Sequence, residues 1–206
     1  MSMEKVKRAV SGFFKDVKEG YSNKRIVVWL AIELVLIGVI ILIDYFTKLY
    51  IYQPIADGSG DIVLIKGVLR FTAVRNTGAS FGIFKDSTFA LAMVSLTTVI
   101  VLFFVWILTP KIRSFWYRGA VVCIIGGGIG NFIDRITLGY VRDFVYFELI
   151  DFAVFNLADS ALTIGTTLLI IYVLLSFKTE INDKKTVNEN TRDTSGTGDE
   201  DDNGSF

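Results

Sequence analysis

Ionisable and amide side chains gather in residues 126–160, within or beside segments apolar enough to cross a membrane. Six of these side chains could take part in chemistry, four of them charged and two of them amides: Asp134, Arg135, Asp143, Asp159, Asn131 and Asn156. Placing a charge at membrane depth is energetically costly, so ionisable groups that are retained there mark a functional site by default.

Asp143 and Asp159 are candidates for a catalytic pair. Asp159 lies just inside the last apolar segment, and Asp143 precedes it by 16 residues in an expected loop on the same side of the membrane. Two adjacent carboxyl groups cannot both ionise readily, so such a pair shares a proton. One member can then deprotonate a water while the other polarises a carbonyl, which predicts general acid–base hydrolysis of a peptide bond.

A third apolar segment, 119–136, places four small or polar residues on one helical face: Gly127, Gly130, Asn131 and Asp134. Glycines in such a row favour close helix packing. That reading does not account for Asn131 or Asp134, which need polar partners. Arg135 is a candidate to neutralise a nearby carboxylate.

The composition is that of a membrane protein. Of the 206 residues 52% are hydrophobic, and the mean hydropathy is +0.52. The sequence contains no histidine and a single cysteine, Cys123. An internal disulfide, a Cys–His nucleophile and a His-based zinc site are therefore excluded.

Apolar segments predict four transmembrane helices at about 26–48, 88–109, 117–136 and 156–177. They divide the chain into a basic leader (1–25), a membrane domain (26–177) and a disordered acidic tail (178–206). In the first span Asp44 and Lys48 are one turn apart and can pair.

Residues 60–84 predict a small β-structure instead of another helix. LRFTAVRN, which begins at Leu69, alternates with the period of a strand. IVLI and then Lys66-Gly67 precede it, which indicates a hairpin.

The leader and the connecting loops predict the topology. Residues 1–25 hold seven Lys/Arg against three Asp/Glu, and the 110–118 loop is also basic. The positive-inside rule then places both termini in the cytoplasm, although the 45–87 loop is basic too. For the leader itself two interpretations stay open, an amphipathic helix on anionic lipid and a solvated basic segment.

Five ordered motifs make the chain resemble the lipoprotein signal peptidase (signal peptidase II) family over roughly 26–177. They are DYFTK, NTGASFG, GGGIGNFIDR, GYVRDF and FNLADS. The segment before FNLADS lacks the Trp-Arg-Phe-Pro-type lead often seen in that family.

The resemblance implies that Asp143 and Asp159 are the catalytic dyad. It also implies that eight other residues bind or position the substrate and the dyad, namely Asn76, Gly78, Asn131, Arg135, Asn156, Asp134, Asp44 and Lys48. The implied fold is four transmembrane helices with a small extracytoplasmic β-cradle and a short extracytoplasmic helix.

The implied activity is cleavage of diacylglyceryl-modified prolipoproteins immediately before the lipidated cysteine. It needs no cofactor or metal, and globomycin-type inhibitors block it. The expected protein is a monomer in the bacterial cytoplasmic membrane, in contact with lipid and without a nucleic-acid partner, and its active site lies near the extracytoplasmic face.

Two other functional classes would use some of the same residues. A Ser/Lys hydrolase would use Ser80 and Lys48, but the neighbouring Asp44 would favour the charged form of Lys48 and so oppose its role as a base. A small carrier or ion-binding bundle would also place acids within the membrane. The absence of repeated halves in the sequence argues against most carriers.

Overall fold

The computed structural model describes residues 2–78 and 87–195. The chain forms two compact units, Met1–Leu169 and Ile170–Phe206. The first unit contains a helical bundle and a sheet, and the second contains the C-terminal part of helix α5 (Leu157–Ser195).

Four helices among the described residues are long and apolar enough to span a membrane, as predicted: Lys24–Ser59, Thr88–Leu108, Phe115–Leu138 and Leu157–Thr179. The first comprises α2 (Lys24–Thr47) and two short π-helical segments, η1 (Lys48–Tyr52) and η2 (Ile55–Ser59). The others are α3 (Thr88–Leu108), α4 (Phe115–Leu138) and the first part of α5.

Helix α4 is the most enclosed span, because three consecutive glycines each admit a different neighbour. A Cβ atom on Gly126 would lie 2.9 Å from Ile40 of α2, and one on Gly128 would lie 2.8 Å from Val99 of α3. A Cβ on Gly127 would lie 2.5 Å from the carbonyl oxygen of Ala158 in α5. The glycine row therefore lets three helices approach α4 closely, as small residues do in membrane bundles.

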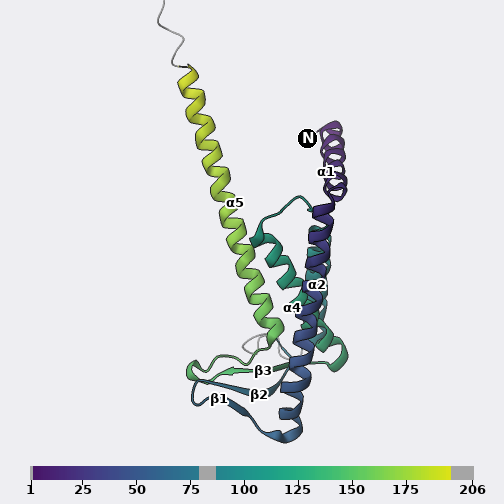
Figure 1. Cartoon of the computed structure of the whole chain (residues 1–206), viewed down its shortest axis with the longest axis vertical. Coiled ribbons are helices and arrows are strands. Elements are labelled where there is room, and N and C mark those ends of the chain that lie inside the picture. The colour runs from purple at the N-terminus through teal and green to yellow at the C-terminus, as the bar shows by residue number, and fades with distance from the viewer. Residues whose placement is uncertain (1, 79–86, 196–206) are drawn as a thin grey trace, which may run out of the picture. The chain divides into compact units, whose positions relative to one another are not determined.

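An antiparallel three-stranded sheet, in the order β1-β2-β3, lies at the end of the bundle where α2 ends and α5 begins (Figure 1). β1 (Ile62–Ile65) and β2 (Leu69–Asn76) form the predicted hairpin, and Gly67 adopts a left-handed φ of 72° in its turn.

The third strand and its connections were not predicted. β3 (Val141–Phe147) follows α4 through Gly139, whose left-handed conformation ends that helix. Its register places Asp143 opposite Val74 of β2. Asp143 is therefore held in a sheet, whereas the sequence predicts a loop. A short 3-10 helix, η4 (Glu148–Ile150), follows β3.

Both ends of the described chain are helical. The leader forms helix α1 (Met3–Ser22), which meets α2 at Asn23 in an extended conformation. The predicted disordered tail is wrong over residues 178–195, where α5 continues as a helix to Ser195. That stretch has no glycine or proline and contains several lysines and glutamates, so little in it stops a helix that has already started.

Candidate active site

A cluster of buried charges joins α2, α4, β3 and α5. Lys48 is fully buried, and its ammonium lies 2.7 Å from Asp44 Oδ2 and 3.1 Å from Asp134 Oδ2. The Arg142 guanidinium lies 2.7 Å from Asp134 Oδ1, and its backbone N–H donates to Asp134 Oδ2. Asp44 Oδ1 accepts the Ala158 N–H at 3.0 Å. Asp44 and Asp134 are thus both paired with cations.

The cations paired with Asp134 are Lys48 and Arg142, and not the adjacent Arg135. Arg135 forms no salt bridge with Asp134 among the described residues, because consecutive helical residues point in different directions. Its guanidinium instead donates to the carbonyl oxygen of Gly78 at 3.3 Å. Arg142 belongs to the GYVRDF motif but was given no role from the sequence. The signal available was a basic residue just past the glycine that ends α4.

Two asparagines connect this cluster to the predicted dyad. Asn131 Nδ2 donates to Asp159 Oδ1 at 2.7 Å, and Asn156 Nδ2 donates to Asp143 Oδ1 at 2.6 Å. Asn131 Oδ1 accepts from Asn156 Nδ2 at 3.0 Å and from Lys48 Nζ at 3.4 Å. Because an ammonium group can only donate, Lys48 holds the oxygen of Asn131 toward itself and the amide NH₂ toward Asp159.

Asp159 is fixed by the start of its own helix. Asn156 caps α5, and its side-chain oxygen accepts the Asp159 N–H at 2.9 Å. The Asp159 carboxylate in return accepts the Asn156 N–H at 3.2 Å. This reciprocal arrangement is a capping box.

Asp143 is fixed from the other side by the end of β2. Asn76, the last residue of that strand, donates from Nδ2 to Asp143 Oδ2 at 2.8 Å. The Asn76 oxygen accepts the Gly78 N–H at 2.9 Å, so the turn after β2 holds the amide in place. Burial, and secondly the charge of Asp159, raise the pKa of Asp143 to about 7, while its bonds to Asn76 and Asn156 act in the opposite direction.

One continuous hydrogen-bonded network therefore contains all ten predicted site residues: Asp44, Lys48, Asn76, Gly78, Asn131, Asp134, Arg135, Asp143, Asn156 and Asp159. Among the described residues no group of three or more metal-ligating side chains is present. The alternative nucleophile Ser80 lies outside the described residues.

A second polar cluster, not predicted from the sequence, lies at the opposite end of α2 and α4. Glu33 is buried, accepts the Trp106 indole N–H at 2.6 Å and pairs with Arg118 at 3.3 Å. It borders a cavity of about 510 Å³ between α2, α4 and α5. The cavity is lined by residues near the start of α2 and the start of α4, whereas the dyad's neighbours lie near the ends of these helices. The cavity is therefore separate from the candidate active site.

Comparison with known proteins agrees with this arrangement. Residues 36–175 match the family model described as signal peptidase (SPase) II. The chain belongs to the signal peptidase II family. The lipoprotein signal peptidase of Streptococcus pneumoniae is 39% identical over 153 residues, which is 74% of this chain and 96% of that protein. The one from Clostridium tetani is 37% identical over 145 residues, 69% and 92% of the two chains.

The fold is shared with solved membrane enzymes. A bacterial membrane enzyme determined by the in meso method superposes with a TM-score of 0.63 at 26% identity, over 84% of this chain and 95% of that one. A second superposes with a TM-score of 0.59 at 29% identity, over 70% and 93%. The signal peptidase II match includes the whole hydrogen-bonded network, but it begins after α1 and ends before the second half of α5.

Proposed function

We propose that the chain is an aspartic endopeptidase that removes the signal peptide from diacylglyceryl-modified prolipoproteins, by cleaving before the lipidated cysteine. Membership of the signal peptidase II family makes it a signal-peptide-cleaving hydrolase and a multi-pass bacterial membrane protein. The proposal adds the catalytic type, the bond that is cleaved and the residues that act.

One observation supports the choice of Asp143 and Asp159 above the other buried acids. Asp44 and Asp134 each form a short salt bridge, with Lys48 and, for Asp134, also with Arg142. In the part of the chain that the structure describes, Asp143 and Asp159 form no salt bridge and accept hydrogen bonds only from amides. They are the acids in this network that can share a proton.

The proposed reaction begins with one proton on the pair. The ionised carboxylate removes a proton from a water, and the water oxygen attacks the carbonyl carbon of the peptide bond. The protonated carboxyl donates its proton to the carbonyl oxygen, which gives a tetrahedral diol. The protonated carboxyl then gives its proton to the amide nitrogen, and the other carboxylate takes a proton from one hydroxyl of the diol. The C–N bond breaks to release an amine and a carboxylic acid, and the pair again holds one proton.

The asparagines contribute orientation in this scheme. The Asn131 side chain holds one oxygen of Asp159, and the Asn156 side chain holds one oxygen of Asp143. Asn76 holds the second oxygen of Asp143. Positioning of this kind removes reorganisation at the moment of reaction. Which aspartate begins as the base is a property of the coupled pair and not of either residue alone.

The decisive experiment is cleavage of a purified diacylglyceryl prolipoprotein by Asp143→Asn and Asp159→Asn variants. Each is expected to lose turnover while remaining folded, because Asn has nearly the shape of Asp but cannot exchange the proton. Asp57→Asn is the matched control, since Asp57 is exposed and accepts a hydrogen bond from Gln53 at the surface. The double variant should be scarcely worse than either single one, because the two groups act as a unit.

Two outcomes would move the chemistry elsewhere. Retained turnover in either dyad variant would exclude the proposed roles. Loss of turnover in a folded Ser80→Ala variant would instead favour a serine nucleophile. A preparation that binds but never cleaves the prolipoprotein, while carrying ions across a membrane, would favour the carrier class.

The orientation of the chain in the membrane is part of the same proposal. Both termini are cytoplasmic, and the sheet and the dyad lie near the extracytoplasmic face, in keeping with the basic leader and the basic 110–118 loop. Gly58→Cys and Asp183→Cys, in a background without Cys123, test it with an impermeant thiol reagent on intact cells. Labelling at position 183, or protection at position 58, would reverse the orientation.

A further inference from the structure

Helix α1 has an apolar face that the first unit leaves uncovered. Five residues of that face are exposed by between 37% and 76%: Met3, Val6, Val10, Phe13 and Phe14. Their spacing of three and four residues places them on one side of the helix. The family match begins at residue 36, so this helix lies outside it.

The same face of α1 is the one that docks on the bundle. Gly20 and Tyr21 continue the apolar row, and Gly20 is buried so closely against Pro110 that a Cβ atom would lie 2.7 Å from its ring. The Tyr21 hydroxyl donates to the carbonyl oxygen of Ile107, at the end of α3, at 3.0 Å. The uncovered apolar residues are therefore turned toward the side on which the spanning helices lie.

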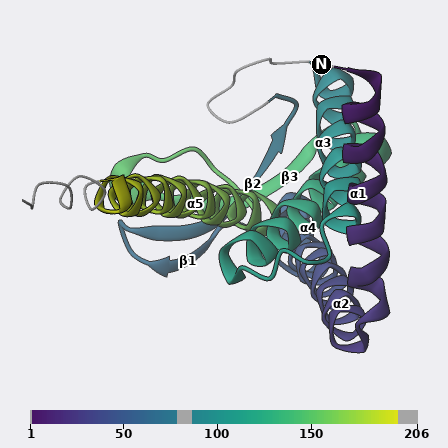
Figure 2. The same ribbon diagram turned by 90° about the horizontal axis from the view of Figure 1, so that it is seen from above.

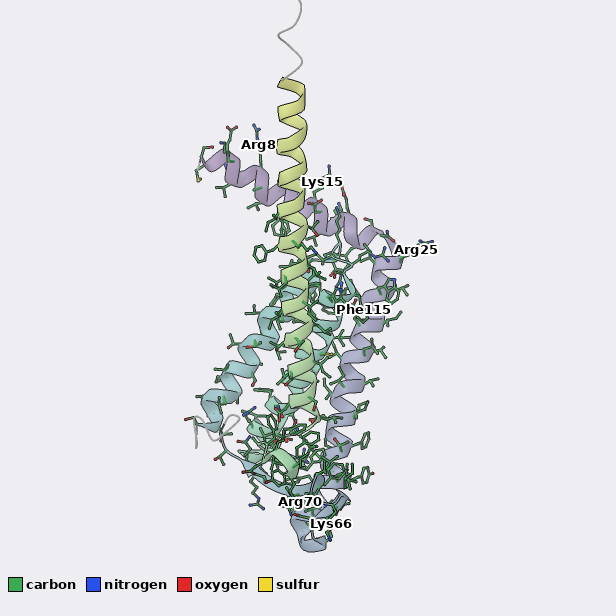
Figure 3. The ribbon with its side chains drawn as sticks, turned by 90° about the vertical axis from the view of Figure 1, so that its left-hand side faces the viewer. Arg8, Lys15, Arg25, Lys66, Arg70 and Phe115 are labelled. Atoms are coloured by element: carbon green, nitrogen blue, oxygen red, sulfur yellow. The ribbon has the colours of Figure 1, made fainter. Side chains whose placement is uncertain are left out.

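The direction of α1 is also that of a helix lying across the end of the bundle. It runs across the end of the bundle, whereas α2 runs along it (Figures 2 and 3). The bend occurs at Asn23, whose extended backbone and capping side chain separate the two helices. Figure 3 shows Arg8 and Lys15 extending from α1 on the side away from the spanning helices.

The charges of α1 are arranged around this face. Lys111, in the turn between α3 and α4, bonds Asp16 at 2.8 Å and Glu19 at 3.0 Å. Two of the helix's acids are thereby held against the bundle by one lysine. Lys7 and Lys18 border the apolar face and form no salt bridge among the described residues, so they are available to other anions.

Aromatic side chains mark a membrane interface at this end of the bundle. Trp29 of α2 is 54% exposed, and Phe115 and Trp116 at the start of α4 are 74% and 37% exposed. Phe115 lies just below α1 in Figure 3. Tryptophan is enriched where spanning helices enter the headgroup region.

We propose that α1 is an interfacial helix that lies on the bilayer surface, with its apolar face among the acyl chains and Lys7 and Lys18 on anionic headgroups. A helix with separate apolar and basic faces binds anionic membranes in this way. Its attachment through Gly20 and Tyr21 fixes it to the end of the bundle away from the dyad. The charge arrangement favours anionic lipid over a second copy of the chain, which would bring like charges together.

The test uses the full chain in lipid nanodiscs, in a Cys123→Ala background. Spin labels are attached at Phe14→Cys on the apolar face and at Gly12→Cys on the opposite face, where a Cβ atom would meet nothing within 4 Å. We expect the label at position 14 to be accessible to oxygen and shielded from a water-soluble nickel reagent. The label at position 12 should show the reverse.

The lipid dependence is tested with two variants of equal charge change. In nanodiscs that contain phosphatidylglycerol, Lys7→Gln/Lys18→Gln should reduce the contrast between the labels more than Arg8→Gln/Lys15→Gln does. Each lysine near an anionic surface contributes roughly fivefold to membrane binding. In nanodiscs of phosphatidylcholine alone the two variants should not differ.

Three outcomes would overturn the proposal. Exposure of both labels to the nickel reagent would mean that α1 is solvated. Shielding of the label at position 14 from both reagents would mean that protein, such as a second copy, covers the face. Equal effects of the two charge variants would remove the assigned role of Lys7 and Lys18.

Discussion

Replacement of Gly127 by alanine tests how α4 positions the start of α5, which carries Asp159 of the proposed dyad. A Cβ atom at residue 127 would lie 2.5 Å from the Ala158 carbonyl oxygen, 3.1 Å from Leu162 and 3.2 Å from Ala161. The nearest of these atoms belongs to backbone, so no side-chain rotation can relieve the contact. The two helices must separate by roughly 0.5 Å or more to bring it to a tolerable distance.

The energetic cost can be isolated with Gly38→Ala as a matched control. Gly38 lies within α2, and a Cβ there would meet nothing within 4 Å. Both substitutions gain the same helix propensity, about 1 kcal/mol. The difference between the two variants therefore reports the steric contact alone, for which overpacking predicts about 1–3 kcal/mol. Gly38→Ala should be as stable as the wild type or slightly more stable.

The effect on activity should exceed the effect on folding. Ala158 immediately precedes Asp159, so a displaced α5 moves one carboxyl of the proposed dyad away from the other. Misplacement of a catalytic group by about 1 Å can cost about a hundredfold in rate, so half that shift should cost roughly tenfold.

The measurements are prolipoprotein turnover and the thermal midpoint of both variants in the same detergent. Full turnover in a stable Gly127→Ala variant would refute the reasoning, because it would show that the α4–α5 contact is not what places Asp159. A variant that loses stability as predicted but cleaves normally would restrict the contact to a structural role.

Three further predictions concern charge. Asp134→Asn should lower the folded yield more than turnover per folded molecule, since loss of one partner of a buried pair costs about 3–5 kcal/mol; turnover reduced as far as in an Asp143 variant would contradict this. Lys48→Met should destabilise the protein by a similar amount in detergent unfolding, whereas Lys66→Met, at an exposed lysine, should not. Turnover should fall as the pH rises through about 7, as the shared proton is lost, and a flat profile to pH 9 would contradict the pKa of Asp143. Because that pKa is raised from 3.8, the folded state holds the extra proton between the two values, so Asp143 should also make stability fall as pH rises across this window.

Features that lie within one helix or one hairpin could be predicted from the local spacing of residues. The Asp44–Lys48 pair follows from a separation of four residues in a helix, and the β1–β2 hairpin follows from strand alternation around Gly67. The four spans follow from length and hydropathy. Each of these signals lies within a window of a few turns, so tertiary contacts do not alter it.

Features that depend on distant contacts could not be predicted in this way. Arg142 reaches Asp134 because Gly139 turns the chain back onto α4, and no helical spacing encodes that return. Val141–Phe147 becomes a strand because it pairs with β2. The register of that pairing shifts between Phe71 and Val74 of β2, and local spacing does not encode such a shift. The hydrogen bond of Arg135 could not be predicted for the same reason, since its acceptor, the Gly78 carbonyl, is 57 residues away.

The buried acids are of two kinds, those that form salt bridges and those of the proposed dyad, which bond only amides. Asp44 and Asp134 are neutralised by Lys48 and Arg142, and their short ion pairs tie together the elements that carry the site. Breaking either pair leaves an uncompensated buried charge, so these ion pairs have a structural role. The proposed dyad needs the opposite property, because an acid held by a permanent cation would be too weak a base. The amides of Asn76, Asn131 and Asn156 meet this need, since they orient a carboxyl group without adding a charge that would lock it in the ionised form.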